Sequence, residues 1–134
     1  MSRKKLTFVG TSVLITATVG QKYERRLTAL RLLGDRRREF VVTDFLRLAV
    51  LPIPLRHGFH EQVKFYEAFF RRVAVWIEPQ AFLDDSYLLA CKYGLGAMDA
   101  LHVAVAASVS AEFVSAEKST KPLYQAYIKA IALF

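Results

Sequence analysis

Short apolar strands that alternate with helices constrain the fold of this chain more than any other feature. Segments rich in β-branched and aromatic residues occur at 6–9, 39–43, 73–77 and 112–118. The segments between them space their apolar residues as helices do, as Tyr23, Leu27, Leu30 and Leu33 show within 21–35. This alternation predicts an α/β fold, a three-layer sandwich in which helices flank a parallel-rich sheet of four to five strands.

The order of the elements follows from apolar spacing and from glycine and proline breaks. Helices are expected at 12–18, 21–35, 44–51, 60–72, 79–92 and 98–109, a proline-rich loop at 52–58, and an edge strand within 127–134. The helix at 98–109 is apolar on nearly every side, which predicts deep burial. We find no repeat, low-complexity tract or linker, so residues 1–134 are expected to form a single domain.

Composition narrows the class of protein. The chain has 134 residues, 54% of them hydrophobic and 23% charged, which is typical of one globular domain. Cys91 is the only cysteine, which fits a reducing cytoplasm. The longest uncharged stretch, residues 100–111, is too short to span a bilayer, and no signal peptide is evident. We therefore expect a cytoplasmic protein that does not associate with membranes.

Positive charge is concentrated in the first part of the chain. The formal net charge is +7, and residues 1–80 hold 15 Lys and Arg against 7 Asp and Glu. Such an excess indicates a polyanionic partner, such as RNA, DNA or an acidic protein, or else a surface that is merely soluble and basic. Candidates for RNA contact are Arg36, Arg37, Arg38, Arg47 and Arg56. Alternatively, Arg37 and Arg38 decorate a solvated turn, and Arg47 covers apolar surface with its stem.

Asp99 is the most informative residue, because it is the only charged group within residues 98–111. A buried carboxylate is costly unless it is paired, hydrogen-bonded or bound to a metal. The alternative is a partly solvated acid at a helix start, which the helix dipole favours. His102 lies three residues later, so a hydrogen bond between the two side chains is expected.

Glu117 follows the strand predicted within 112–118. Ligands of open α/β sheets gather at the carboxyl ends of strands, so Asp99 and Glu117 could lie at the same edge. An exposed loop acid beside Lys118 is the alternative. The first strand ends at the same edge with Gly10, which carries no charge.

Four stretches in order resemble the PIN-domain family, and within it the VapC-like toxins of bacterial toxin–antitoxin pairs. They are "FVGTSVLITA" (8–17), "VVTDFLRLAVLP" (41–52), "KFYEAFF" (64–70) and, the most specific, residues 93–123 with "DALH" followed by a strand that ends in an acid. The resemblance implies a parallel sheet between helices and hydrolysis of RNA with Mg²⁺ or Mn²⁺. Hard divalent cations prefer oxygen ligands, which explains the family's cluster of acids.

The resemblance places two of the family's four acids and finds two missing. Asp99 and Glu117 occupy two of these metal-binding, catalytic positions. The other two positions fall on Gly10 and Ala49, so half of the expected carboxylates are absent.

The family's hydroxyl residues are present as Thr11 and Ser12, which would cap the helix or hydrogen-bond metal-bound waters. The expected function is that of a ribonuclease descendant with weakened or lost hydrolysis, a pseudoenzyme acting through RNA or a partner. One alternative is an active Mg²⁺/Mn²⁺ endoribonuclease with a reduced acidic site, and the other is a module that only binds proteins. The resemblance also implies a cognate antitoxin and a homodimer.

Overall fold

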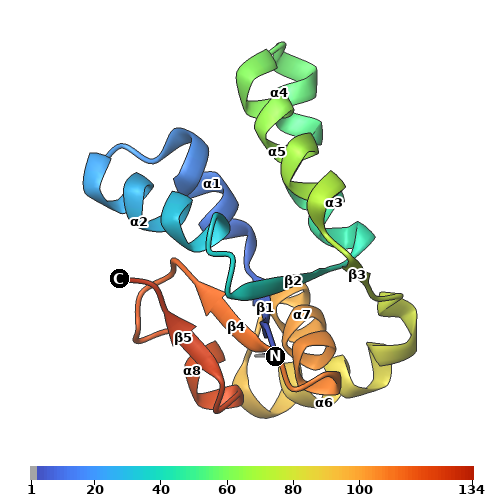
Figure 1. Cartoon of the computed structure of the whole chain (residues 1–134). Coiled ribbons are helices and arrows are strands. Elements are labelled where there is room, and N and C mark those ends of the chain that lie inside the picture. The colour runs from blue at the N-terminus through green and yellow to red at the C-terminus, as the bar shows by residue number, and fades with distance from the viewer. Residues whose placement is uncertain (1–2) are drawn as a thin grey trace.

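A five-stranded, all-parallel sheet forms the middle layer of the computed structural model, which describes residues 3–134. The strand order is β3–β2–β1–β4–β5, and helices lie on both faces of the sheet (Figure 1). The strands are β1 (Lys5–Val9), β2 (Arg38–Val42), β3 (Val75–Trp76), β4 (Glu112–Ser115) and β5 (Ala130–Ala132). The predicted α/β three-layer sandwich is confirmed.

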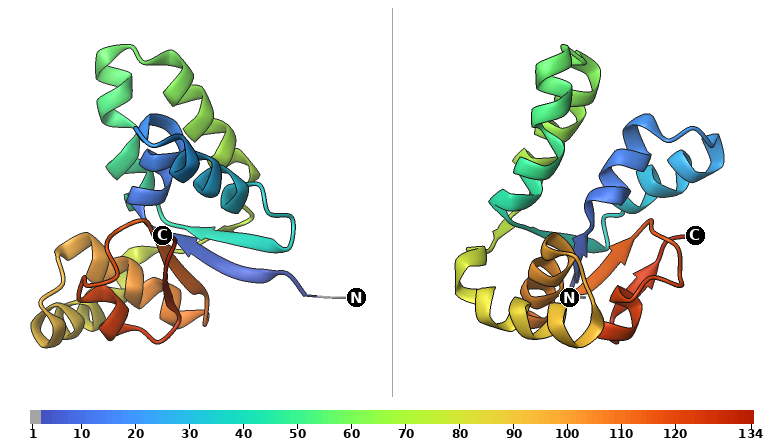
Figure 2. Two further views of the ribbon diagram at one scale, coloured as in Figure 1. Left: turned by 90° about the vertical axis from the view of Figure 1, so that its left-hand side faces the viewer. Right: turned by 180° about the vertical axis from the view of Figure 1, so that it is seen from behind.

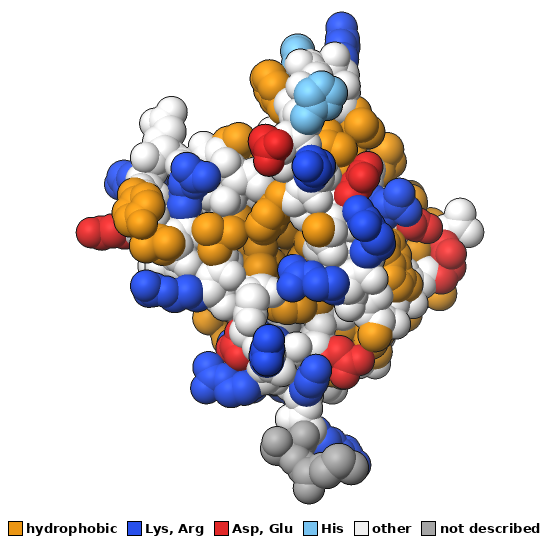
Figure 3. Space-filling model, turned by 45° about the horizontal axis from the view of Figure 1, so that its top comes forward, with side chains coloured by type: hydrophobic (Ala, Val, Ile, Leu, Met, Phe, Trp, Pro, Cys, Tyr) orange, Lys and Arg blue, Asp and Glu red, His pale blue; other side chains and the backbone are white. Residues whose placement is uncertain are grey.

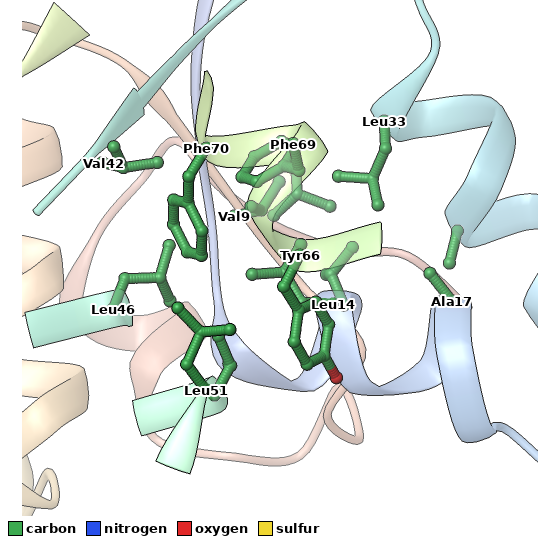
Figure 4. Packing of buried hydrophobic residues seen from close by; sticks show 14 residues of the cluster. Val9, Leu14, Ala17, Leu33, Val42, Leu46, Leu51, Tyr66, Phe69 and Phe70 are labelled. Atoms are coloured by element: carbon green, nitrogen blue, oxygen red, sulfur yellow. The ribbon is translucent and has the colours of Figure 1, made fainter. Parts of the chain in front are cut away.

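The helices of the first half of the chain cover one face of the sheet. They are α1 (Thr11–Val19), α2 (Tyr23–Leu33), α3 (Asp44–Val50), α4 (Pro52–His57) and α5 (His60–Arg72). Side chains alternate between the faces of a strand, and this face receives Val9, Val42 and Val114. Figure 4 shows Tyr66 and Phe69 of α5 packed in this apolar core, and both side chains are buried.

The second half of the chain covers the other face, where Phe8, Val41 and Phe113 point. Its helices are the 3₁₀ helix η1 (Pro79–Phe82), α6 (Leu83–Tyr93), α7 (Ala97–Ser108) and the short α8 (Leu123–Ala126). Every residue of α7 from 100 to 106 is buried. The predicted deep burial of this helix is therefore confirmed.

Residues 52–57 form α4, so the prediction of a loop at 52–58 is wrong. Pro52 occupies the first helical position and Pro54 the third. The first N–H groups of a helix have no partner within the helix, so a proline there removes no hydrogen bond. Gly58 ends α4 in a left-handed conformation, with φ of 68°. Figures 1 and 2 show α4 and the outer part of α5 projecting from the rest of the molecule.

Three other element boundaries differ from the expectation. β3 spans two residues instead of the five predicted, η1 precedes α6 where one helix was expected, and α8 was not predicted. These segments are short, so local sequence preferences determine them weakly. The tail does supply the expected edge strand, because β5 pairs only with β4 at the end of the sheet.

Helix length and hydropathy bear on the expectation of no membrane association. Within residues 3–134 no single helix is both long and apolar enough to cross a bilayer. One bent pair, η1–α6 (residues 79–93) with α7, meets the criteria of length and composition only when its members are taken together, and they lie at 118° to each other.

Candidate functional site

The carboxyl ends of β1 and β4 lie at the topological switch point of the sheet, where later strands are added on the opposite side of β1. β2 and β3 lie on one side of β1, whereas β4 and β5 lie on the other. Open α/β sheets bind ligands at such switch points. Gly10 directly follows β1 and donates its N–H to the Val114 carbonyl oxygen at 2.9 Å. Glu117 lies two residues beyond the end of β4, so both chain segments leave the sheet at the same edge.

Asp99 lies in the first turn of α7 and is half-buried. The pKa of Asp99 is raised, first by burial and then by the negative charge of Glu117, while Lys121 lowers it. The structure therefore brings the two carboxylates within electrostatic range of each other. Lys121, which the sequence did not single out, partly offsets their repulsion.

Hydroxyl groups hold the backbone that presents Glu117. The Ala116 N–H donates to Ser12 Oγ at 3.0 Å, and the Glu117 N–H donates to Ser115 Oγ at 3.1 Å. The Tyr124 hydroxyl donates to the Glu117 carbonyl oxygen at 2.7 Å. Tyr124 belongs to α8, so the absence of that helix from the predicted elements explains why its role was missed.

Thr11 and Ser12 do not cap α1 as one reading of the resemblance suggested. Gly10 is the N-cap residue, Thr11 is the first helical residue, and no side chain caps the helix. The Ser12 hydroxyl is engaged by the backbone after β4, as described above. Ser12 thus links the chain segments that follow the carboxyl ends of β1 and β4. A contact with metal-bound water stays a prediction for both hydroxyls.

The backbone does not require glycine at position 10. Gly10 has φ of −69° and ψ of 161°, an extended conformation that any L-residue adopts. A Cβ atom there would meet two ring carbons of Phe113 at 3.6 Å and Ser12 Oγ at 3.7 Å, which are ordinary van der Waals contacts. The position where the resemblance expects an aspartate therefore accepts a Cβ atom.

No other acid takes the place of the two missing carboxylates. Ala49 is half-buried on α3 and packs against the core cluster that contains Val9. Asp44 is exposed at the start of α3, where its carboxylate lies 3.9 Å from the Arg47 guanidinium. Within residues 3–134, no three or more His, Cys, Asp or Glu side chains are grouped as metal ligands. The site therefore retains two carboxylates.

His102 bonds Thr43 and not Asp99, so the expected Asp99–His102 hydrogen bond is wrong. His102 Nε2 lies 3.0 Å from Thr43 Oγ1, and the ring packs on Phe8 with centroids 4.6 Å apart. The His102 side chain is 2% exposed, and burial lowers its pKa to about 4. His102 is thus a neutral core residue, and its hydrogen-bonding partner is the Thr43 hydroxyl that follows β2.

Two of the five arginines proposed for RNA contact, Arg47 and Arg56, belong to α3 and α4 on the face of the sheet that the first half of the chain covers. Arg47 pairs with Asp44 and stacks over Trp76, with 5.9 Å between its guanidinium carbon and the ring centroid. This contact supports the alternative that Arg47 covers apolar surface with its side chain. Arg56 is exposed in the last turn of α4.

Replacing Asp99 with Asn is expected to stabilise the metal-free protein at pH 7. Because the pKa of Asp99 is raised on folding, its contribution to stability is present below the unfolded value of 3.8 and is lost as pH rises through the folded pKa. Removal of such a charge should increase the free energy of unfolding by about 0.5–2 kcal/mol, toward the lower end because the carboxyl keeps contact with solvent.

Urea unfolding at pH 7 and pH 3.5, with EDTA present, measures this effect. The gain should be confined to pH 7, and Asp85→Asn, which alters an exposed acid of α6, should show none. Equal stability of the parent and the Asp99→Asn variant at pH 7 would show that the two carboxylates do not repel each other.

Comparison with known proteins found a structural neighbour, whereas the two comparisons by sequence found no match. A chain of a toxin–antitoxin complex from Klebsiella pneumoniae superposes with a TM-score of 0.72 over 96% of this chain and 98% of that chain. The two chains share one fold. Their sequences are 15% identical, so the likeness establishes the fold alone. No family model matches this sequence, and no curated protein matches it.

Proposed function

We propose that this protein is a PIN-like, VapC-type ribonuclease descendant in which metal-dependent RNA hydrolysis is weakened or lost, and which acts through RNA or a protein partner. The observation that carries the proposal is the interacting Asp99–Glu117 pair near the switch point, where Gly10 follows β1 and would accept a Cβ atom at ordinary contact distances. The fold shared with a chain of a toxin–antitoxin complex supports it, because the match covers nearly all of both chains.

The remaining donor set suits at most one hard divalent cation. Mg²⁺ is often held by one or two carboxylates together with waters and substrate phosphates. Asp99 and Glu117 would hold the ion, and a bound ion supplies activation of water and neutralises charge on the phosphate. Lys121 competes with any cation for Asp99. Fewer ligands also position an ion less firmly, and a displacement of about 1 Å can cost roughly 10²-fold in rate.

An RNA-cleavage assay with Mn²⁺ tests the proposal. The parent is expected to cleave at least about 100-fold more slowly than a Gly10→Asp, Ala49→Glu variant, because the restored acids would position the ion. Asp99→Asn in the restored background should abolish cleavage. Asp85→Asn in that background is the matched control and should leave cleavage unchanged.

Efficient Mn²⁺-dependent cleavage by the parent, lost in Asp99→Asn, would overturn the proposal. That result would establish the alternative of an active endoribonuclease with a reduced acidic site. The raised pKa of Asp99 is the observation that keeps this alternative open, since perturbed acids cluster at functional sites.

A protein partner is supported by apolar surface on the projecting helices. Leu48, Ile53, Leu55 and Phe59 are each more than half exposed. Figure 3 shows apolar side chains gathered across the face that carries these helices. Large exposed apolar areas mark protein interaction sites. A cognate antitoxin is the partner that the shared fold suggests, and a homodimer stays a prediction that sedimentation equilibrium would measure.

The same surface favours the second alternative, a module that only binds proteins. Equilibrium RNA binding separates this alternative from the proposal. Binding that weakens steeply with salt indicates phosphate contacts, whereas no binding at low salt would favour the protein-only module.

A further inference from the structure

Basic side chains line two adjoining clefts at the amino edge of the sheet, opposite the acidic pair. The first has a volume of about 490 Å³ and the second about 360 Å³. Between them they are lined by seven cations, which are Arg3, Lys4, Lys5, Arg36, Arg37, Arg38 and Arg72. Figure 3 shows Lys and Arg side chains gathered beside the amino-terminal end of the chain. We call these seven residues and the two clefts the amino-edge basic surface.

Strand pairing assembles this surface from two separate basic segments. Residues 3–5 lead into β1, and residues 36–38 lead into β2. The parallel register places Lys5 opposite Arg38, and the Lys5 N–H donates to the Arg37 carbonyl oxygen at 2.8 Å. Two basic runs more than thirty residues apart in sequence therefore lie side by side.

Part of this charge is committed to holding the edge together. Arg38 donates to Glu112 Oε1 at 2.7 Å and to Thr7 Oγ1 at 2.8 Å. Arg37 pairs with Asp35 at 3.1 Å, and Lys5 lies 3.6 Å from Glu112. Glu112 and Asp35 therefore form ion pairs with three of the seven cations.

The other four cations are available to a ligand. These four cations are Arg3, Lys4, Arg36 and Arg72. In residues 3–134, no carboxylate lies within 4 Å of their charged groups. Lys4 and Arg36 line both clefts, so they occupy the centre of the surface. Asp35 lines both clefts and Glu39 lines the second, so the seven cations outnumber the acids of the lining. A concave surface with such an excess of positive charge attracts a chain of anions.

The lining distinguishes a nucleic-acid backbone from a protein partner. Among residues 3–134, the first cleft is lined by Arg and Lys side chains and by Asp35. Protein interfaces rely on buried aromatic or aliphatic anchors, which this cleft does not offer. Arginine forks match phosphate oxygens with two hydrogen bonds. Among residues 3–134, the aromatic residues that line the clefts are Phe40, which is half-buried, and Phe69, which is buried. The described lining therefore offers no exposed ring on which bases could stack.

We propose that the amino-edge basic surface binds the sugar–phosphate backbone of RNA without reading its bases. This inference deepens the RNA-binding part of the proposed function and rests on it. The five residues of β1 separate this surface from the acidic pair by about 16 Å. RNA is therefore held at the edge of the sheet that carries no acidic pair, and its retention does not depend on a metal ion.

Fluorescence anisotropy with a labelled 20-nucleotide single-stranded RNA of mixed sequence, in EDTA, tests the surface. If four cations each neutralise one phosphate, the logarithm of the association constant should fall with the logarithm of salt concentration at a slope of about −2.8. Lys4→Gln with Arg36→Gln should reduce the slope by about 1.4 and weaken binding about 50-fold at 50 mM salt. Neither side chain forms an ion pair within residues 3–134, so the fold should persist, which circular dichroism checks.

The matched control is Arg26→Gln with Lys64→Gln, which removes the same charge from the exposed surface of α2 and α5. An equal loss of affinity in this control would overturn the inference and show that binding follows net charge. A polyglutamate of equal charge that displaces the RNA as well as unlabelled RNA does would also overturn it, in favour of an acidic protein.

The outcomes distinguish this inference from the proposed function. If the parent binds RNA but the Lys4 and Arg36 changes leave the slope unaltered, the surface is wrong and the proposed function stands. If the parent cleaves RNA efficiently, the proposed loss of catalysis is wrong and the surface stands. No RNA binding at 50 mM salt would overturn both the surface and the RNA-binding part of the proposal.

Discussion

The dissociation constant for Mn²⁺ is expected to fall on the order of 100-fold when Gly10 is replaced by Asp and Ala49 by Glu. The number of carboxylate ligands is a principal determinant of affinity for hard cations. Position 10 accepts a Cβ atom at ordinary contact distances and lies at the end of β1, beside the backbone that leads to Glu117. Helix α3, which carries position 49, contacts α1. Isothermal calorimetry of the parent and the double variant measures the difference.

The neutral pair Gly10→Asn with Ala49→Gln separates charge from shape. These side chains have nearly the size of the acids but lack their charge, so the Mn²⁺ affinity should remain that of the parent. Thermal unfolding without metal should show that Gly10→Asp with Ala49→Glu is less stable than the neutral pair, because clustered carboxylates repel one another. A double variant that gains no Mn²⁺ affinity while remaining folded would show that positions 10 and 49 do not face the acidic pair.

Lowering the pH from 7 to 5 is expected to reduce the free energy of unfolding by about 2 kcal/mol through His102 alone. Its pKa falls from 6.5 in the unfolded chain to about 4 in the folded protein because the ring is buried. The unfolded state therefore takes up a proton first, and stability is lost as pH falls from 6.5 toward 4. The full effect is about 3 kcal/mol, at 1.36 kcal/mol for each pKa unit.

The structure explains why the ring stays neutral. Thr43 Oγ1 accepts the Leu46 N–H at 3.2 Å and caps α3, which leaves its hydroxyl proton free to donate to His102 Nε2. A protonated ring would place a positive charge beside Phe8 in the core. Asp99, which lies three residues earlier, is half-buried and interacts with Glu117 and not with His102.

Urea unfolding of the parent and His102→Gln at pH 7 and pH 5 isolates this contribution. The glutamine variant should lose about 2 kcal/mol less than the parent over this interval, whatever its stability at pH 7. His57→Gln, which alters an exposed histidine of α4, is the control and should retain the parent's pH dependence. Equal pH dependence in the parent and the His102→Gln variant would contradict burial as the cause.

Much of the fold could be predicted because its signals are local. The strands near 6–9 and 39–43 and the helix near 60–72 each carry an apolar pattern that persists over the whole element. The all-apolar segment that forms α7 has only the core as a suitable environment. Residues 52–57 escaped prediction because prolines usually interrupt helices, and only their places within the first turn made them compatible with α4.

The candidate site was predictable in part. Strand order places the ends of β1 and β4 together, so a motif that follows each strand indicates one site. Lys121 and Tyr124 could not be found in this way, because they lie beyond β4 in segments whose positions the sequence did not predict. The partner of His102 was also inaccessible, because Thr43 lies fifty-nine residues earlier and on another helix start.

The sequence by itself determined the alternation of strands and helices, the burial of α7 and the absence of acids at positions 10 and 49, because each depends on residue type and local spacing. Only the tertiary structure decided which side chains meet. Parallel pairing of β1 with β2 joins the two basic segments at the amino edge, and the neighbouring ends of β1 and β4 lie near Asp99 and Glu117. The physical reason is that contacts between distant segments are set by packing the whole sheet and its helices, and no local pattern encodes them.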